Sequence, residues 1–381
     1  MIYVHVPFCH RKCTYCAFFS KPESAKWNMP SYVDALLEEM ERRKAEQPHP
    51  IRTVYFGGGT PSILPVNQLA RIVAGLRRCF DLSQLEEVTL EANPEDLSPQ
   101  YLADLANLHF FNRLSIGVQS LDDQMLRLIG RRHTALQALD AVENAHRASF
   151  RNLSLDFIYG LPQSFQLSSF NFQLVSHLSA YALTVEPGTA LARQVEQGRV
   201  SLPGDDEVVR QYHTLRQRFE AAGFRQYEVS NYARPGFESR HNSRYWDRTP
   251  YLGLGPGAHS FDGRRRRWNN PDGTVGEETL THADAFNELL MTSLRTVRGL
   301  DLSLVPEQYK EKLHRQMQPY IDCGWIKLST SPSQPSTLNS QLSTLNSQLS
   351  TLNSQLSTFY RPTPDGLLHA DGIAAALFIC S

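Results

Sequence analysis

The sequence alternates short strand-like runs with longer helical stretches, and this alternation restricts the fold more than any other feature of the chain. The strand-like runs are 2–6, 53–56, 87–91, 113–118, 153–159, 182–185 and 226–229. The helical stretches are 31–46, 66–79, 99–108, 123–147, 167–179 and 206–222. Strands that alternate with helices in this way predict an α/β fold, in which helices cover a parallel sheet.

Polar or glycine-rich residues follow nearly every predicted strand. Three cysteines follow the first strand, GGGTPS follows the second, the third ends at Glu91, the fourth leads into Gln119, and the fifth carries Asp156. In a parallel barrel the carboxyl ends of the strands lie at one face, where barrel enzymes build their active sites. Each of these residues alone is equally well explained as a solvated side chain or a turn. Their repeated position predicts one shared site.

Cys9, Cys13 and Cys16 stand just after the first predicted strand, with the spacing C-x3-C-x2-C. A structural zinc ion normally takes four ligands, commonly from two groups of cysteines, and no second group follows at a suitable spacing. His10 is the alternative fourth ligand, but it lies inside the loop between Cys9 and Cys13. Three thiolates suit an iron–sulfur cluster that keeps one iron open to another ligand. We therefore expect a 4Fe–4S cluster here.

The composition is that of an ordinary soluble globular protein. Of the 381 residues, 41% are hydrophobic and 20% are charged, and the formal net charge is −1. This balance gives no electrostatic argument for a nucleic-acid partner. The one dense basic run, 264–267, is expected to form a solvated loop. No targeting segment and no apolar run of membrane-spanning length is visible, which predicts a cytoplasmic protein.

Eight motifs occur along the chain in the order YVHVPFC-x3-C-x2-C, GGGTPS, EANPE, RLSIGVQS, LDFIYGLPQ, EVSNYARPG, SRHNSRYW and GLGPGAHS. Together they resemble the oxygen-independent coproporphyrinogen III oxidase-like family of radical S-adenosylmethionine (SAM) proteins, over about residues 1–328 and 359–378. The resemblance implies a partial TIM-type (β/α)6 radical SAM barrel at 1–230 and a connecting segment at 231–275. It implies a small, mainly helical C-terminal domain at 276–381.

The resemblance also implies cofactors and the residues that bind them. Cys9, Cys13 and Cys16 would hold a 4Fe–4S cluster, and SAM would bind the iron that they leave open. The positions that match SAM-binding residues of the family are Tyr3, Tyr15, Gly58, Gly59, Thr60, Glu91, Gln119, Arg131 and Asp156.

Two features bear on the function within this family. The residue two positions after Cys16 is Phe18, where the dehydrogenase HemN has a further cysteine, and His241 begins an HNxxYW motif similar to that of HemW-type haem chaperones. Haem iron commonly takes an axial histidine, so His241 is the tentative haem ligand, although alone it would be an ordinary loop histidine. The resemblance favours a chaperone that delivers haem to acceptor haemoproteins and takes electrons from a donor. Peripheral membrane contact during haem transfer stays open.

The alternative function is that of an oxygen-independent coproporphyrinogen III oxidase, which carries out radical decarboxylation in porphyrin biosynthesis. A third interpretation is a radical methyltransferase or a haem-degrading relative. The SAM-binding positions do not separate these functions, because all three classes share them. Whether the protein is an enzyme therefore stays open at the level of sequence.

The segment at about 331–358 interrupts the C-terminal domain with three copies of STLNSQL. Its leucines alternate four and three apart, as in a coiled coil. Ser, Thr and Asn fill the other positions, however, and these are mediocre helix formers. We expect a solvated low-complexity insertion.

Overall fold

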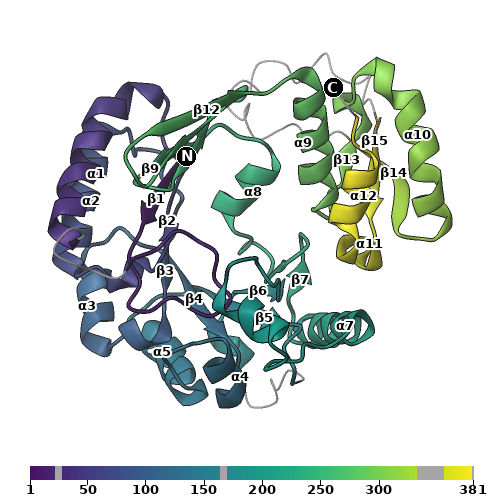
Figure 1. Ribbon diagram of the computed structural model, residues 1–381. Coiled ribbons are helices and arrows are strands. Elements are labelled where there is room, and N and C mark those ends of the chain that lie inside the picture. The colour runs from purple at the N-terminus through teal and green to yellow at the C-terminus, as the bar shows by residue number, and fades with distance from the viewer. Residues whose placement is uncertain (22–27, 164–169, 333–355, 380–381) are drawn as a thin grey trace. The chain divides into compact units, whose positions relative to one another are not determined.

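The computed structural model describes residues 1–21, 28–163, 170–332 and 356–379 (Figure 1). The chain forms two compact units. The first contains Met1–Gln226, Ser230–Arg244 and Thr249–Thr279, and the second contains Tyr227–Val229, Tyr245–Arg248 and Leu280–Ser381. The domain boundaries expected from the sequence divide the chain differently and stay a prediction. The STLNSQL copies lie outside the described residues except for the last residue, Leu356. The two ends of the expected insertion, 331–332 and 356–358, are not a solvated segment but pair with each other in β14 (Ile326–Pro332) and β15 (Leu356–Pro362).

The first unit is built on a nine-stranded sheet with the order β7-β8-β6-β5-β4-β3-β2-β1-β9. Its central six strands are parallel and follow one another in chain order. They are β1 (Ile2–Val6), β2 (Thr53–Gly58), β3 (Glu87–Ala92), β4 (Arg113–Gln119), β5 (Asn152–Tyr159) and β6 (His177–Ala182). This arrangement confirms the expected partial (β/α)6 barrel.

Helices follow the strands and cover the outer face of the curved sheet (Figure 1). They are α1 (Met29–Arg43), α2 (Val66–Cys79), α3 (Pro99–Asn107), α4 (Asp123–Leu128), α5 (Ala135–Arg147), α6 (Ala190–Glu196) and α7 (Asp205–Ala221). The layer between strands and helices is apolar, with Val54, Phe56, Leu69 and Ile72 fully buried. Burial of this layer is the main favourable contribution to the stability of such a fold.

Three predicted elements in this part of the chain differ in the structure. The helix expected at 123–147 is two helices, because Gly130 adopts a φ of 77° after α4 and Thr134 starts α5 with a capping box. The helix expected at 167–179 and the strand expected at 182–185 are replaced by β6, preceded by a short 3-10 turn (Phe172–Leu174). Leu178 and Ser179 are both buried, so β6 lacks the alternation by which a half-exposed strand is recognised.

The edges of the sheet and a small second sheet were not expected. β9 (Leu252–Leu254) pairs with β1, and β7 (Arg225–Gln226) and β8 (Asn231–Ala233) replace the strand predicted at 226–229. β10 (His259–Phe261), β11 (Arg265–Asn269) and β12 (Val275–Thr279) form a three-stranded antiparallel sheet. The basic run expected to be a loop lies largely in β11, where cross-strand ion pairs with acidic residues of β12 support it.

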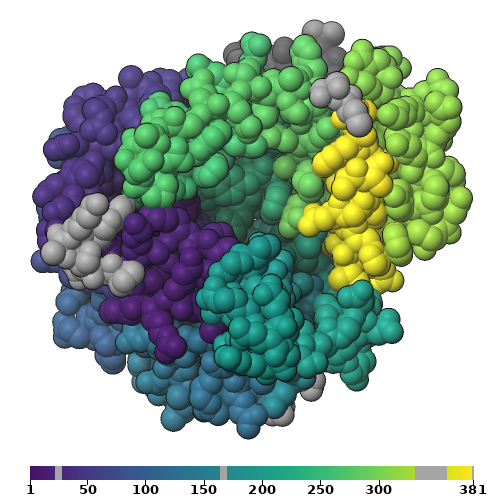
Figure 2. Space-filling model, viewed as in Figure 1, coloured from purple at the N-terminus to yellow at the C-terminus, as the bar shows by residue number. Residues whose placement is uncertain are grey.

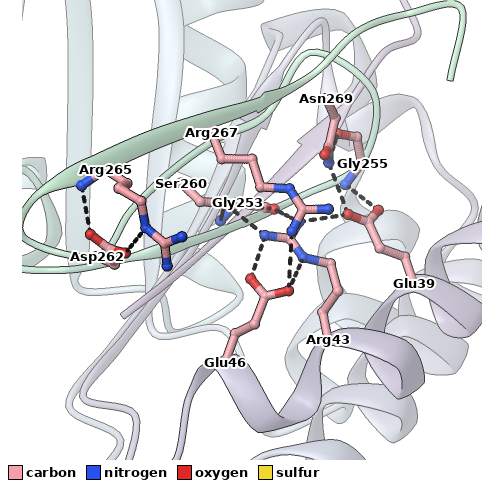
Figure 3. Close-up of polar contacts among 10 residues, drawn as sticks. All are labelled: Glu39, Arg43, Glu46, Gly253, Gly255, Ser260, Asp262, Arg265, Arg267 and Asn269. Carbon is pink, nitrogen blue, oxygen red and sulfur yellow. Dashed lines mark hydrogen bonds and ion pairs between the residues drawn. The ribbon is translucent and has the colours of Figure 1, made fainter. Parts of the chain in front are cut away.

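A buried guanidinium ties this region to helix α1 (Figure 3). All five N–H groups of Arg43 are used: they donate to Glu39, to both oxygens of Glu46, to the carbonyl of Gly253 (2.8 Å) and to Oγ of Ser260 (3.0 Å). Figure 3 also shows that the Glu39 carboxylate faces the loop that follows β9 and the end of β11. Because the guanidinium has a planar five-donor geometry, lysine cannot reproduce this set of contacts.

The second unit is small and mainly helical, as the sequence predicts. It contains α9 (His282–Leu294), α10 (Glu307–Asp322), α11 (Pro364–Leu368) and α12 (Ala370–Ala376) with a three-stranded sheet of β13 (Leu300–Asp301), β14 (Ile326–Pro332) and β15 (Leu356–Pro362). Its core includes the fully buried Leu290, Leu294, Met317 and Ala374. In the part of the chain that the structure describes, no helix is long and apolar enough to cross a membrane.

Replacement of Arg43 by lysine tests the buried network. Arg43→Lys should lower the free energy of unfolding by about 2 kcal/mol, because several buried acceptors lose their donors. Urea unfolding followed by circular dichroism measures this loss. Arg42→Lys is the matched control, since Arg42 lies on the same helix and makes only an exposed contact with Glu38. Equal unfolding midpoints for the two variants would contradict the role given to Arg43.

Candidate cofactor site

The cysteine loop follows β1 and is tied to the end of α4 and to the start of α6. The Thr14 N–H donates to the carbonyl of Ile129 (3.0 Å), and the Thr14 carbonyl accepts from the N–H of Leu191 (2.8 Å). Cys9, Cys13 and Cys16 are free thiols of intermediate exposure. Figure 2 shows atoms of the purple N-terminal segment at the surface of the viewed face, beside teal atoms of later residues. The loop is therefore anchored while its sulfurs stay accessible.

Two side chains from other loops contact the sulfurs. Thr60 Oγ1 lies 3.2 Å from Cys9 Sγ, and Arg131 donates from Nη1 to Cys13 Sγ at 3.7 Å. Burial and the neighbouring Cys13 and Cys9 thiols raise the pKa of Cys16. The raised pKa disfavours the thiolate form of Cys16. A bound metal centre would stabilise this form, because thiolates are its ligands and its positive charge offsets theirs.

The three cysteines do not form a site for a single ion. Among the described residues, no three Cys, His, Asp or Glu side chains converge closely enough to hold one metal ion. Whether these thiols hold a zinc ion or a larger cluster therefore stays a prediction.

The glycine run after β2 brings the backbone against the site. A Cβ on Gly58 would stand 2.7 Å from the His5 ring, and Gly58 has a φ of 114° that favours glycine. A Cβ on Gly59 would stand 2.4 Å from the carbonyl oxygen of Phe8. Only glycine fits this cradle, because protein atoms already occupy the space that a Cβ would take.

Glu91 is the last residue but one of β3, and its carboxylate lies in the barrel interior. The hydroxyl of Tyr55 donates to Glu91 Oε1 at 2.8 Å. Burial raises the pKa of Glu91 to about 7, although the Tyr55 hydrogen bond acts in the opposite direction. A carboxyl group with its pKa near neutrality takes up charge readily when a cationic ligand binds beside it.

Gln119 and Arg131 meet at the end of β4. Gln119 has a φ of 65°, unusual for a residue other than glycine, at a register shift between β4 and β5. Such strained backbone is concentrated at ligand sites. Arg131 Nη2 donates to the carbonyl of Gly117 and to Asn93 Oδ1, both at 2.6 Å. Arg131 therefore links the ends of β3 and β4 to Cys13.

Asp156 projects into the same interior from β5. Its carboxylate accepts from the hydroxyl of Ser115 at 3.3 Å, and a second hydrogen bond from Ser179 supports it. Burial raises the pKa of Asp156, while the positive charges of Arg113 and Arg131 oppose this shift. The carboxylate thus lies among polar groups of three neighbouring strands, β4, β5 and β6.

The two tyrosines expected at the site take different positions. Tyr3 lies on β1, where its ring stacks on Tyr55 and its hydroxyl lies 3.2 Å from His5 Nδ1. Tyr15 belongs to the cysteine loop and packs on the apolar cluster that contains Met125 and Ile129. Burial raises the pKa of Tyr15, so its hydroxyl stays neutral.

His241 lies at the other end of the sheet. It belongs to α8 (Arg240–Trp246), and its N–H donates to Glu87, the first residue of β3, at 2.9 Å. Its Nδ1 lies 2.9 Å from the hydroxyl of Thr53, the first residue of β2, and its side chain is fully buried. Burial lowers the pKa of His241 to about 3. The structure therefore does not bring His241 together with the cysteines, and haem ligation by His241 stays a prediction that requires this end of the barrel to open.

Sequence reasoning missed two contributors to the site. Asn93 orients Arg131 and also donates to Thr60 Oγ1 at 3.2 Å. His5 contacts the Gly58 backbone, and its Nε2 lies 3.2 Å from the carbonyl oxygen of Phe19. Both lie inside motifs that the sequence analysis quoted, directly beside residues that it selected. Their position in those motifs was the signal that could have identified them.

Three comparisons with known proteins, by family model, by sequence and by structure, agree with one another. Residues 3–166 match the family model of the radical SAM superfamily. The chain is 34% identical to the heme chaperone HemW of Lactococcus lactis, over 82% of this chain and 86% of that protein. It is 30% identical to HemW of Synechocystis, over 99% and 95% of the two chains. The coproporphyrinogen III oxidase HemN from Escherichia coli has a similar fold, with a TM-score of 0.76 at 22% identity, over 99% of this chain and 89% of that one.

The pKa of Glu91 predicts a pH-dependent stability difference. An acid whose pKa rises from 4.5 to about 7 on folding stabilises the folded state at low pH, and this contribution is lost as the pH rises through that range. Glu91→Gln mimics the protonated form. Relative to this variant, the cofactor-free wild-type protein should lose about 2 kcal/mol of stability between pH 5 and pH 8. Urea unfolding at both pH values measures the difference, and parallel pH profiles would contradict it.

Proposed function

The chain belongs to the HemW family of radical SAM proteins, and we propose from this that it is a haem chaperone that delivers haem to acceptor haemoproteins. The observation that carries the proposal is the 34% identity to a heme chaperone over 82% of the chain. The residues at the carboxyl edge of the sheet support it, because they fit a cluster and SAM. The proposed location is the cytoplasm.

Cys9, Cys13 and Cys16 would hold a 4Fe–4S cluster, which supplies one-electron chemistry to SAM when it is bound. Thr60 and Arg131 would hydrogen-bond to the cysteine sulfurs, and hydrogen bonds of this kind tune the potential of such centres. An electron donor, still to be identified, completes this part of the proposal.

The remaining site residues suit the different parts of SAM. The cationic amino group of its methionyl part would bind beside the Glu91 carboxylate, and its carboxylate would approach the backbone of Gly58 and Gly59. Asp156 and Gln119 carry acceptors that suit the ribose hydroxyls. Tyr3, Tyr15 and Thr60 complete the expected set, and Arg131 adds the positive charge that offsets the carboxylates.

Removal of the cysteine thiolates tests the cluster. The triple variant with Cys9, Cys13 and Cys16 replaced by alanine should retain no cluster after anaerobic reconstitution, because no cysteine ligands remain in the loop. Iron and sulfide analysis measures this against the wild-type protein. Cys79→Ala is the control, since Cys79 lies on α2 and outside the loop. A full iron content in the triple variant would refute the assignment.

Haem titration and coproporphyrinogen turnover separate the two candidate activities. A chaperone should bind haem stoichiometrically and transfer it to an apo-haemoprotein, which absorbance spectroscopy follows. It should not form protoporphyrinogen when the reconstituted protein meets coproporphyrinogen III under anaerobic reducing conditions. Protoporphyrinogen above the level of the triple cysteine variant would favour the oxidase instead.

A further inference from the structure

Arg113 places a buried positive charge in the barrel. It is the first residue of β4 and is only 1% exposed. Among the described residues, its Nε and Nη1 atoms have no hydrogen-bond partner, and its guanidinium makes no ion pair. Arg43 is the contrasting case, because every N–H group of that buried guanidinium is used. A buried charge without a partner destabilises the folded state, so contacts within the fold do not account for Arg113.

The strand register places Arg113 beneath the carboxylates of the candidate site. Arg113 and Ser115 lie on one face of β4, because successive side chains of a strand point to opposite faces. The Ser115 hydroxyl donates to Asp156, so this face is the barrel interior. Arg113 pairs with Thr89 of β3, and Glu91 follows Thr89 by two residues. Two residues of a strand span about 6.6 Å, which a long arginine side chain can bridge.

The charge of Arg113 acts on both carboxyl groups. Burial raises the pKa of Asp156 and raises the pKa of Glu91 to about 7, and the guanidinium of Arg113 opposes both shifts. The negative charge of Asp156 adds to the rise at Glu91. Arg131 also opposes the shift at Asp156, but its guanidinium already donates to three other groups, among them Cys13 Sγ. Arg113 therefore supplies these acids with a positive charge that no contact of its own engages among the described residues.

The other titratable groups on which Arg113 acts stay neutral. Burial raises the pKa of Tyr55 well above its ordinary value. Burial lowers the pKa of His177 and of His241, and the charge of Arg113 adds to both shifts. None of these three side chains carries a positive charge near neutral pH, so none of them can replace Arg113 as the counter-charge of the acids.

We propose that Arg113 is a positioning residue whose charge keeps Glu91 and Asp156 ionised as counter-charges for the cationic amino and sulfonium groups of SAM. This inference rests on the proposed function of the site. Two buried carboxyl groups without a nearby cation oppose each other's ionisation and hold a proton. A cationic ligand would then have to displace that proton, which lowers its affinity. The role needs only a positive charge, whereas the contacts of Arg43 need a planar guanidinium.

Calorimetric titration of the anaerobically reconstituted, full-length protein with SAM tests this role. Arg113→Met removes the charge and retains an unbranched side chain. Its affinity for SAM should fall by about ten-fold at pH 6.5, because loss of the cation raises the pKa of the carboxyl groups by about one unit. At pH 8.5 the loss should shrink to about two-fold or less, since the carboxylates are ionised in both proteins.

Two further variants separate charge from packing. Arg113→Lys retains the charge, so its affinity at pH 6.5 should lie within about two-fold of the wild-type value. Arg52→Met is the matched control and should change the affinity at neither pH, since Arg52 precedes β2 and pairs with Glu86 outside the site. In urea unfolding of the cofactor-free proteins, Arg113→Met should keep or exceed the wild-type midpoint, because a buried charge without a partner is removed. Arg113→Gln takes its place if Arg113→Met does not fold.

The outcomes separate this inference from the proposed function. If the reconstituted wild-type protein binds no SAM, the SAM part of the proposed function fails, and this inference fails with it. If it binds SAM and the neutral variant binds equally well at pH 6.5, only the inference is overturned. A loss of equal size at both pH values, or a loss that Arg113→Lys does not restore, would assign Arg113 to the packing of the barrel and overturn it. Failure of both neutral variants to fold would overturn it as well, because the fold itself would then need the charge.

Discussion

The hydrogen-bond register of the parallel sheet is the constraint on which the rest of this structure depends. Val6 pairs with Gly58, Glu91 with Ser115, and Gly117 with Asp156, so successive strands end at nearly the same level. The cysteine loop, the glycine cradle and two carboxylates therefore meet at one edge, although they come from different parts of the chain. A shift of one residue in any strand would turn its inward side chains toward the helices.

The interior of the barrel is polar, in contrast to the apolar layer beneath the helices. Thr53, Thr89, Arg113, Ser154 and His177 are almost fully buried. Nε and Nη1 of Arg113 have no hydrogen-bond partner among the described residues, although its charge acts on both Glu91 and Asp156. Buried polar groups without partners destabilise a fold. Burial of the helix-facing apolar residues offsets this cost.

The sequence predicted the barrel because the alternation of strands and helices is a local signal. The candidate site residues could be selected from the sequence because each motif is continuous in the chain, and their roles stay a prediction. It missed β6, since a strand buried on both faces shows no alternation, and it missed β11, since a basic run resembles a solvated loop until the acidic partners of β12 are known. The burial of His241 was equally inaccessible, because it depends on contacts with the starts of β2 and β3.

By itself the sequence determined the chemical groups at hand: three thiols at cluster spacing, a glycine run and carboxylates at strand ends. Only the tertiary structure decided which of them meet. Tyr55 bonds to Glu91, Arg131 joins Asn93 to Cys13, and Arg43 anchors Ser260, 217 positions further along the chain. Such contacts arise from strand register and helix packing. No local pattern encodes them, because each depends on where distant backbone segments come to lie after folding.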